Sequence, residues 1–234
     1  MFFSLTKEKA NAKLNHAFLN GDFKPAIAAY QKLILKDNSD HELFNDLGVA
    51  YLESGNISES VKALKKATQL SDTCINWNNY GRALLKHKFF SESRVAFSKA
   101  RALDSKDPQP WYNIVVSLRE EGLLSDSLEE LKSFLLTFKN HCSGQSDLGC
   151  HYLEQEKISE AILCFEHAIA SNQSALPPRL NLIRLLCDQG RYPESMKHLE
   201  AIAKLGMQVK VDSNVNNVTI QLNGQVFYNG NARN

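Results

Sequence analysis

Four side chains of the types that bind metals occur within eleven residues, at His141-Cys142 and Cys150-His151. Zinc sites favour ligands paired two to four residues apart, and the eight residues from Cys142 to Cys150 span one expected helix. A helix presents these groups poorly for a tetrahedral site. Cysteines in periodic helical segments behave as small apolar residues. The pattern therefore favours structural cysteines, and we expect no metal site.

Motifs for catalysis are also missing from the sequence. There is no G-x-S-x-G, no glycine loop that cradles phosphate and no H-E-x-x-H. The seven histidines are scattered, without a serine or acid at a suggestive spacing. Acidic residues such as Glu59 and Glu92 begin expected helices, where negative charge suits the helix dipole. We therefore expect a protein that is not an enzyme and uses no cofactor.

Composition and charge narrow the class of partner. Lys and Arg number 27 against 26 Asp and Glu, so no net field draws nucleic acid or anionic lipid. Phe2 to Leu5 is too short for a secretory signal, and no apolar run is long enough to span a membrane. The five cysteines are an odd set without a C-x-x-C pair, which favours reduced thiols. We expect a cytoplasmic protein that neither inserts into membranes nor binds nucleic acid.

One residue pattern returns about every 34 positions along the chain. Gly55 follows Gly21 by one such period, Gly122 and Gly190 each follow after two more, and Lys88 and Glu156 take the two intermediate places. Large apolar residues follow two positions later: Phe23, Ile57, Phe90, Leu124, Ile158 and Tyr192. Small residues come three further on, at Ala26, Ser60, Ser93, Ser127, Ala161 and Ser195. A third set is again large and apolar: Tyr30, Leu64, Phe97, Leu131, Phe165 and Leu199. Within each repeat, spacings of three and four residues place its three members on one stripe of a helix.

The half of each repeat that precedes the glycine position is helical in pattern as well. Phe44, Leu47, Gly48 and Tyr51 recur as Trp77, Tyr80, Gly81 and Leu84. All six prolines fall at or within the first turn of an expected helix, where the missing amide hydrogen costs nothing. Each repeat is therefore expected to be helix, tight turn, helix.

The W-x-x-[LY]-G-x-x-[YL] half, followed by [AS]-x-x-x-[FYL]-x-x-A, resembles the tetratricopeptide repeat over residues 7 to about 209. The resemblance implies an all-α right-handed superhelix of six helical hairpins, forming a solenoid over residues 1–209. The repeats are expected at about 7–40, 41–73, 74–107, 108–141, 142–175 and 176–209. Val115 departs from the pattern, because a small residue is usual at its place.

Residues 210–234 form a C-terminal extension of different composition, rich in valine and asparagine. Val218 to Asn229, with Asn223-Gly224 at its centre, predicts a β-hairpin, since Asn-Gly suits a type I′ turn. In that register Val218, Ile220, Leu222 and Phe227 share a face that can cover the last helix. The alternatives are a disordered tail and an exposed strand edge that pairs with a partner or a second copy.

The family resemblance also implies where a partner binds, because first helices of successive repeats line a concave groove in such proteins. Family binding places carry over to Asn45, Asn78, Asn79, Arg82, Lys86, Tyr112, Asn113, Arg119, Asn181 and Arg184. Asparagine amides both donate to and accept from a peptide backbone. Arg82, Lys86 and Arg119 favour an acidic or C-terminal segment. Asparagine is also common at one of these places in the family, so ancestry alone is the competing explanation.

The sequence thus favours an adaptor or scaffold that binds a protein or peptide in the groove. The alternative is a structural protein that assembles with itself, as a homo-oligomer, through its N-terminal end or its tail.

Overall fold

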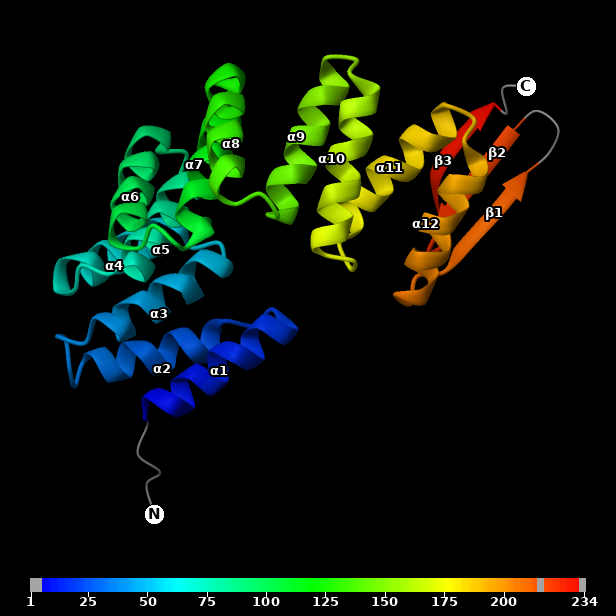
Figure 1. The fold of residues 1–234 in the computed structure, drawn as a ribbon. Coiled ribbons are helices and arrows are strands. Elements are labelled where there is room, and N and C mark those ends of the chain that lie inside the picture. The colour runs from blue at the N-terminus through cyan, green and yellow to red at the C-terminus, as the bar shows by residue number, and fades with distance from the viewer. Residues whose placement is uncertain (1–5, 214–216, 232–234) are drawn as a thin grey trace. The chain divides into compact units, whose positions relative to one another are not determined.

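The structure is a computed structural model that describes residues 6–213 and 217–231 (Figure 1). Twelve α-helices and three β-strands lie within these residues. The chain divides into two compact units, the N-terminal unit of residues 1–130 and the C-terminal unit of residues 131–234. The boundary falls inside one helix, and each unit is described by itself.

The N-terminal unit consists of antiparallel helix pairs, in which each odd-numbered helix is the first of its pair. Its helices are α1 (Lys7–Asn20), α2 (Lys24–Ile34), α3 (His41–Glu53), α4 (Ile57–Leu70), α5 (Cys74–Lys86), α6 (Phe90–Leu103), α7 (Pro108–Glu121) and the first half of α8 (Leu124–Thr137). Consecutive helices up to α7 pack against one another. The expected all-α class, built from antiparallel helix pairs, is confirmed.

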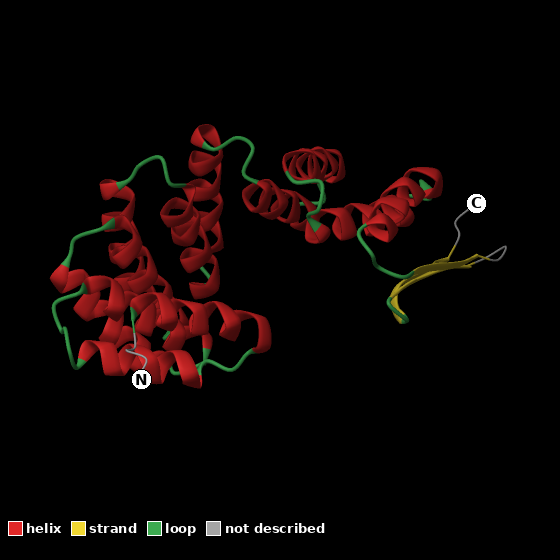
Figure 2. Ribbon diagram, turned by 90° about the horizontal axis from the view of Figure 1, so that it is seen from below, coloured by secondary structure: helices red, strands yellow, loops and turns green. Residues whose placement is uncertain are grey.

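The C-terminal unit continues the helix pairs and ends in a small sheet (Figure 2, strands in yellow). It contains the end of α8, then α9 (Cys142–Glu154), α10 (Ile158–Ser171), α11 (Leu176–Asp188), α12 (Tyr192–Lys204), β1 (Val209–Ser213), β2 (Asn217–Leu222) and β3 (Gln225–Asn231). The division of the chain into a repeat array of residues 1–209 and an extension of residues 210–234 stays a prediction.

A left-handed backbone conformation ends the first helix of every pair. The residues at this place have positive φ: Gly21 (77°), Gly55 (81°), Lys88 (63°), Gly122 (90°), Glu156 (58°) and Gly190 (72°). Glycine adopts this conformation without steric cost, whereas a lysine or glutamate is held there by the surrounding structure. One turn geometry therefore recurs at all six places that the period marks, including the two without glycine.

The two helices of a pair approach closely where the first helix has no side chain. A Cβ atom added to Gly81 would lie 2.6 Å from the ring of Phe97, a side chain with no exposed surface. Gly149 meets Phe165 in the same way, and Gly48 meets Leu64. In the fourth pair Val115 takes this place and is itself buried. These contacts set the distance between paired helices.

We expect Gly81→Ala to lower the free energy of unfolding of the N-terminal unit by about 1–2 kcal/mol, because the added methyl group overpacks the contact with Phe97. This effect outweighs the better helix propensity of alanine. Urea unfolding followed by circular dichroism measures the change. Ser98→Ala, on the exposed side of α6, is the matched control and should stay within about 0.5 kcal/mol of wild type. Equal stability of the two variants would show that the contact sets no helix spacing.

The C-terminal sheet corrects part of the sequence expectation. The hairpin is confirmed, with the Asn223-Gly224 turn at φ values of 49° and 79°, but β1 adds a third antiparallel strand that was not predicted. A bulge shifts the register after Ile220, so this residue pairs with Tyr228 and not with Phe227. The expected position of Val218 concerns a side chain outside the described residues.

The sheet packs on the last helix pair in the place of a further helix (Figure 1). Ile220, Leu222 and Tyr228 form one buried cluster with Ile183 of α11 and other side chains of α11 and α12. Burial and a hydrogen bond to Asp188 raise the pKa of Tyr228 to about 12. A terminal pair without such a cover would leave its apolar side in water, so the strands complete the core of this unit.

We expect Ile220→Ala to destabilise the C-terminal unit by about 2–4 kcal/mol, because Ile220 is 1% exposed and the substitution leaves a cavity under the sheet. Val226→Ala on the neighbouring strand is the control, since Val226 is 62% exposed. Hydrogen exchange of α11 and α12 amides measures the stability of this unit separately. If both variants exchange alike, the sheet does not stabilise the last pair.

None of the helices in the described parts of the chain has the length and apolar content needed to cross a membrane.

Candidate interaction face

Three first helices of the N-terminal unit, α3, α5 and α7, follow one another and place their polar residues on one side. α3 contacts α5, and α5 contacts α7. Each helix starts at a capped residue: Asp40, Thr73 and Asp107 accept hydrogen bonds from backbone amides of the first turn. These starting points lie 33 and 34 residues apart in the sequence, so the first helices of successive repeats bring their polar residues close together. We call this side the first-helix face.

The asparagines predicted to bind a peptide form hydrogen bonds with one another, and their role in binding stays a prediction. Asn79 Nδ2 donates to Asn45 Oδ1 at 2.9 Å, and Asn113 Nδ2 donates to Asn78 Oδ1 at 2.8 Å. Each bond joins two neighbouring repeats, because its partners are one repeat apart in the sequence. An asparagine amide has two donor hydrogens and an acceptor oxygen with two lone pairs, so one bond leaves capacity for others. The pairs link neighbouring first helices and leave part of their hydrogen-bonding capacity unused.

Asn45 lies beneath this surface, at 9% exposure. Its amide accepts from Asn79 and donates to Asp46 at 3.3 Å. Burial raises the pKa of the Asp46 carboxyl, against the opposing effect of the hydrogen bond from Asn45. Asn45 therefore positions Asn79, and as a direct contact for a partner it stays a prediction.

Arg82 lies between neighbouring repeats and is bonded to both. Its guanidinium donates to Glu53 Oε1 at 3.1 Å and to Asn79 Oδ1 at 3.4 Å. The Arg82–Glu53 ion pair is partly exposed, and such pairs contribute about 0–1 kcal/mol. Its main effect is to hold the arginine across α3 and α5.

A cavity of about 270 Å³ opens on the first-helix face. Arg82, Lys86 and Asn113, all predicted from the sequence, line it. Sequence reasoning did not assign the other lining residues to the site: Leu52, Glu53, Leu85, Val116 and Glu120. Two cations and two carboxylates surround an apolar base of leucine and valine, so the cavity carries no net formal charge. Its volume suits one apolar side chain, with polar groups of the same ligand at the rim.

The remaining predicted residues fall into two groups. Tyr112 and Arg119 lie half-buried on α7 of the N-terminal unit. Asn181 and Arg184 lie on α11 of the C-terminal unit, where Asn181 Nδ2 is 3.5 Å from Cys150 Sγ. The Arg184 guanidinium lies 5.3 Å from the ring centre of Phe227 on β3, so it already serves the packing of the sheet.

The candidate metal ligands have structural roles. His141 Nδ1 accepts from the Gly144 amide at 3.1 Å and caps α9, and His151 is buried. Burial raises the pKa of the Cys142 thiol, and it raises the pKa of Cys164 to about 11, which disfavours the thiolate that metals bind. In the described parts of the chain, no three His, Cys, Asp or Glu residues cluster as a metal site would require.

A consecutive array of such helix pairs defines a helical-repeat protein. A family model described as "Tetratricopeptide repeat" matches residues 12–73 and 146–209, more than half of the chain. The chain belongs to the tetratricopeptide repeat family. Repeats of this family build protein-interaction scaffolds in general.

The chain is similar in sequence to one known protein and in fold to two solved structures described next. Human cilia- and flagella-associated protein 70 is 27% identical over 143 residues, which are 50% of this chain and 13% of the human protein. PilF of Pseudomonas aeruginosa superposes with a TM-score of 0.65 at 16% identity, covering 85% of this chain and 92% of that one. YrrB, described as a TPR protein with an unusual peptide-binding site, has a TM-score of 0.52 at 18% identity and covers 70% of this chain and 86% of its own. At these identities the two structures establish the fold.

We expect a double-mutant cycle of Asn45→Ala and Asn79→Ala to give a coupling of about 0.5–1.5 kcal/mol in the free energy of unfolding. Their hydrogen bond joins two repeats and is partly shielded from water, so its loss should not be additive. Chemical unfolding of the wild type, both single variants and the double variant supplies the four values. A coupling indistinguishable from zero would show that the asparagine pair does not fix the repeat spacing.

Proposed function

We propose that this chain is a non-catalytic adaptor that binds an extended segment of a partner protein on the first-helix face of its N-terminal unit. The cavity beside the Asn113–Asn78 pair carries the proposal. It joins an apolar base to polar groups that retain hydrogen-bonding capacity, which is the combination that an extended peptide needs.

The segment binds in two ways. One apolar side chain enters the cavity over Leu85 and Val116, while the peptide backbone runs along the amides of Asn78 and Asn113. A peptide group of the ligand can donate to one asparagine through its N–H and accept from the next through its carbonyl. The asparagine pairs hold these amides in place before binding, so little conformational freedom is lost when the ligand arrives.

The charge of the cavity favours a mixed ligand over a purely acidic one. Arg82 and Lys86 are matched by Glu53 and Glu120 around the same opening. A strongly acidic segment would therefore meet repulsion as well as attraction. Lys86 is the exposed cation at this opening, and it is the residue that would select an acidic group next to the apolar side chain.

Two of the similar proteins support this function without defining the partner. YrrB is a repeat protein with a peptide-binding site, by its description. The human relative is associated with cilia and flagella. Because the alignment covers 13% of that protein, a place in a ciliary or flagellar assembly belongs to the proposal for this chain.

Selection from a random peptide display library, followed by fluorescence anisotropy on the enriched peptides, tests the face directly. Val116→Phe adds a ring at the cavity and should weaken binding about tenfold or more, since a side chain excluded from its pocket costs at least about 1.4 kcal/mol. Asn113→Ala should weaken binding about three- to tenfold through the lost amide.

Lys66→Ala is the matched control, because Lys66 is exposed on α4, the second helix of its pair. Its affinity should stay within about twofold of wild type. If the enriched peptides bind all four proteins alike, the first-helix face is not the binding site.

A further inference from the structure

One place in the repeat changes its chemistry along the chain. Phe44, Trp77 and Trp111 hold it in the second to fourth repeats, and Gln145 and Arg179 hold it in the fifth and sixth. From Trp77 onward, successive members follow one another at the same interval in the sequence. The position lies in the first turn of a first helix.

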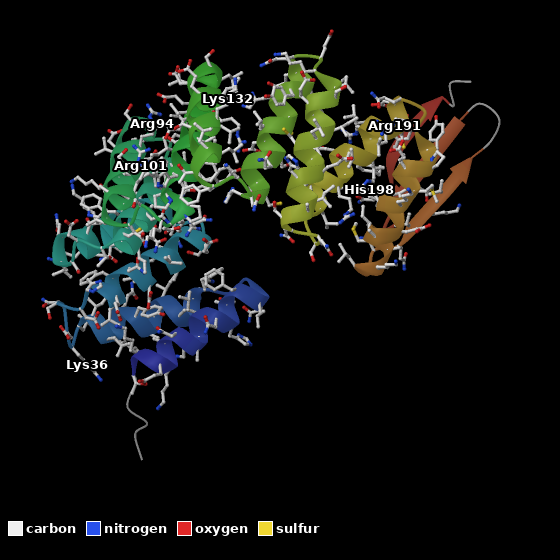
Figure 3. The ribbon with its side chains drawn as sticks, in the orientation of Figure 1. Lys36, Arg94, Arg101, Lys132, Arg191 and His198 are labelled. Carbon is white, nitrogen blue, oxygen red and sulfur yellow. The ribbon has the colours of Figure 1, made fainter. Side chains whose placement is uncertain are left out.

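In the N-terminal unit an indole fills this place beneath a cation. Lys99 Nζ lies 4.1 Å from the ring centre of Trp77, and the Arg101 guanidinium lies 4.6 Å from that of Trp111. Figure 3 labels Arg101 on α6. Both cations lie on α6, which is the partner helix of α5 and precedes α7, and both rings are partly buried.

In the C-terminal unit the same place opens into two adjoining cavities, of about 490 and 560 Å³. Every residue lining the smaller cavity has a counterpart one repeat later in the lining of the larger one, and Gln145 corresponds to Arg179. Ala170 lines both. A repeating feature of the fold therefore builds both cavities, on the side of the second helices α10 and α12.

Gln145 and Arg179 make the same backbone contact. Gln145 Nε2 donates to the Lys139 carbonyl at 2.8 Å, and Arg179 donates to the Gln173 carbonyl at 2.6 Å. The backbone contact therefore needs no charge. The arginine adds a positive charge that this contact does not require.

That charge is buried without a counter-ion. Arg179 is 6% exposed, and its Nε atom has no acceptor within residues 6–213 and 217–231. No carboxylate of these residues forms an ion pair with it. His198, labelled on α12 in Figure 3, lies 3.4 Å from the guanidinium and offers only a neutral ring nitrogen. Burial lowers the pKa of Arg179, in accord with a site that disfavours an uncompensated charge.

We infer that the larger of these two cavities binds the carboxylate of an acidic peptide segment, held by the Arg179 guanidinium. Nε–H and a neighbouring Nη–H form a planar fork that matches the two oxygens of a carboxylate. Ile169, Ala201 and Leu205 line the same cavity and suit an apolar residue next to the acid. Among the lining residues, Glu166 opposes the further cation Lys204, which favours a singly charged carboxylate over a phosphate. This site is separate from the first-helix face.

Nuclear magnetic resonance of the ¹⁵N-labelled protein tests the site through the arginine Nε–H signals. The probes are acetyl-Leu-Glu-Leu-amide, its glutamine counterpart acetyl-Leu-Gln-Leu-amide, and inorganic phosphate. The glutamate peptide should shift the Arg179 signal saturably and bind about tenfold or more tightly than either other probe. Arg179→Gln keeps the backbone contact seen at Gln145, so the variant should fold and should bind the glutamate peptide about tenfold or more weakly.

Arg179→Trp is the second variant. It introduces the residue type that Trp111 has at the equivalent place, fills the cavity and should also abolish binding. Lys132→Gln removes an exposed cation on α8 in the same unit and should bind within about twofold of wild type. The proposal is overturned by equal binding of the glutamate and glutamine peptides, by tighter binding of phosphate, by unchanged affinity in folded Arg179 variants, or by the lack of a saturable shift.

Discussion

The close contact between a glycine of one helix and a large side chain of its partner helix determines how the other elements of this structure are spaced. Phe97 lies on the backbone at Gly81, and Phe165 lies on the backbone at Gly149. Dispersion forces and exclusion of water act over a few ångströms, so such a contact fixes the helix separation more tightly than a loose apolar surface does. With that contact present at Gly48, Gly81 and Gly149, the starting points of successive first helices recur at nearly regular intervals. Hydrogen bonds between repeats, such as that of the Asn79 amide, depend on this regularity.

One repeat position can therefore serve different purposes in different copies. Where Trp77 and Trp111 stand, a rigid aromatic ring packs under a cation of α6. Where Gln145 and Arg179 stand, a thinner and flexible side chain reaches the same backbone region and leaves room beside it. The backbone is common to all copies because the helix contacts set it elsewhere. The side chain at this position is then free to determine whether the surface is closed or open.

Most of the fold follows from spacing in the sequence. The period located the turn even at Lys88 and Glu156, where glycine is missing, because the apolar stripes on both sides keep the register. The tail was harder to predict. The pattern indicated the hairpin around Asn223-Gly224, but β1 has no turn signal of its own and is identified only by its pairing. The register shift beside Ile220 likewise has no signal in the alternation of apolar and polar residues.

The candidate site could be predicted by position but not by contact. Arg82, Lys86 and Asn113 do line one cavity. Sequence spacing could not show that the asparagines pair with one another, since that depends on distances between neighbouring helices. Arg184 follows the same repeat rule but lies in a different compact unit, where the sheet engages it. Arg179 is not among the predicted binding residues, because a charged residue in an amphipathic helix is expected on the surface and only the structure shows that it is buried.

The covering strands have a consequence for synthesis of the protein on the ribosome. α12 ends at Lys204 and β3 ends at Asn231, so the last helix pair leaves the ribosome before the chain that covers it. At a synthesis rate of about 5–20 residues per second, the delay is on the order of seconds. During that time Ile183 and Leu199, which end up in the shared cluster, lack their strand contacts. Until the strands are in place, these apolar side chains stay exposed, and transiently exposed apolar surface makes a folding intermediate prone to aggregate.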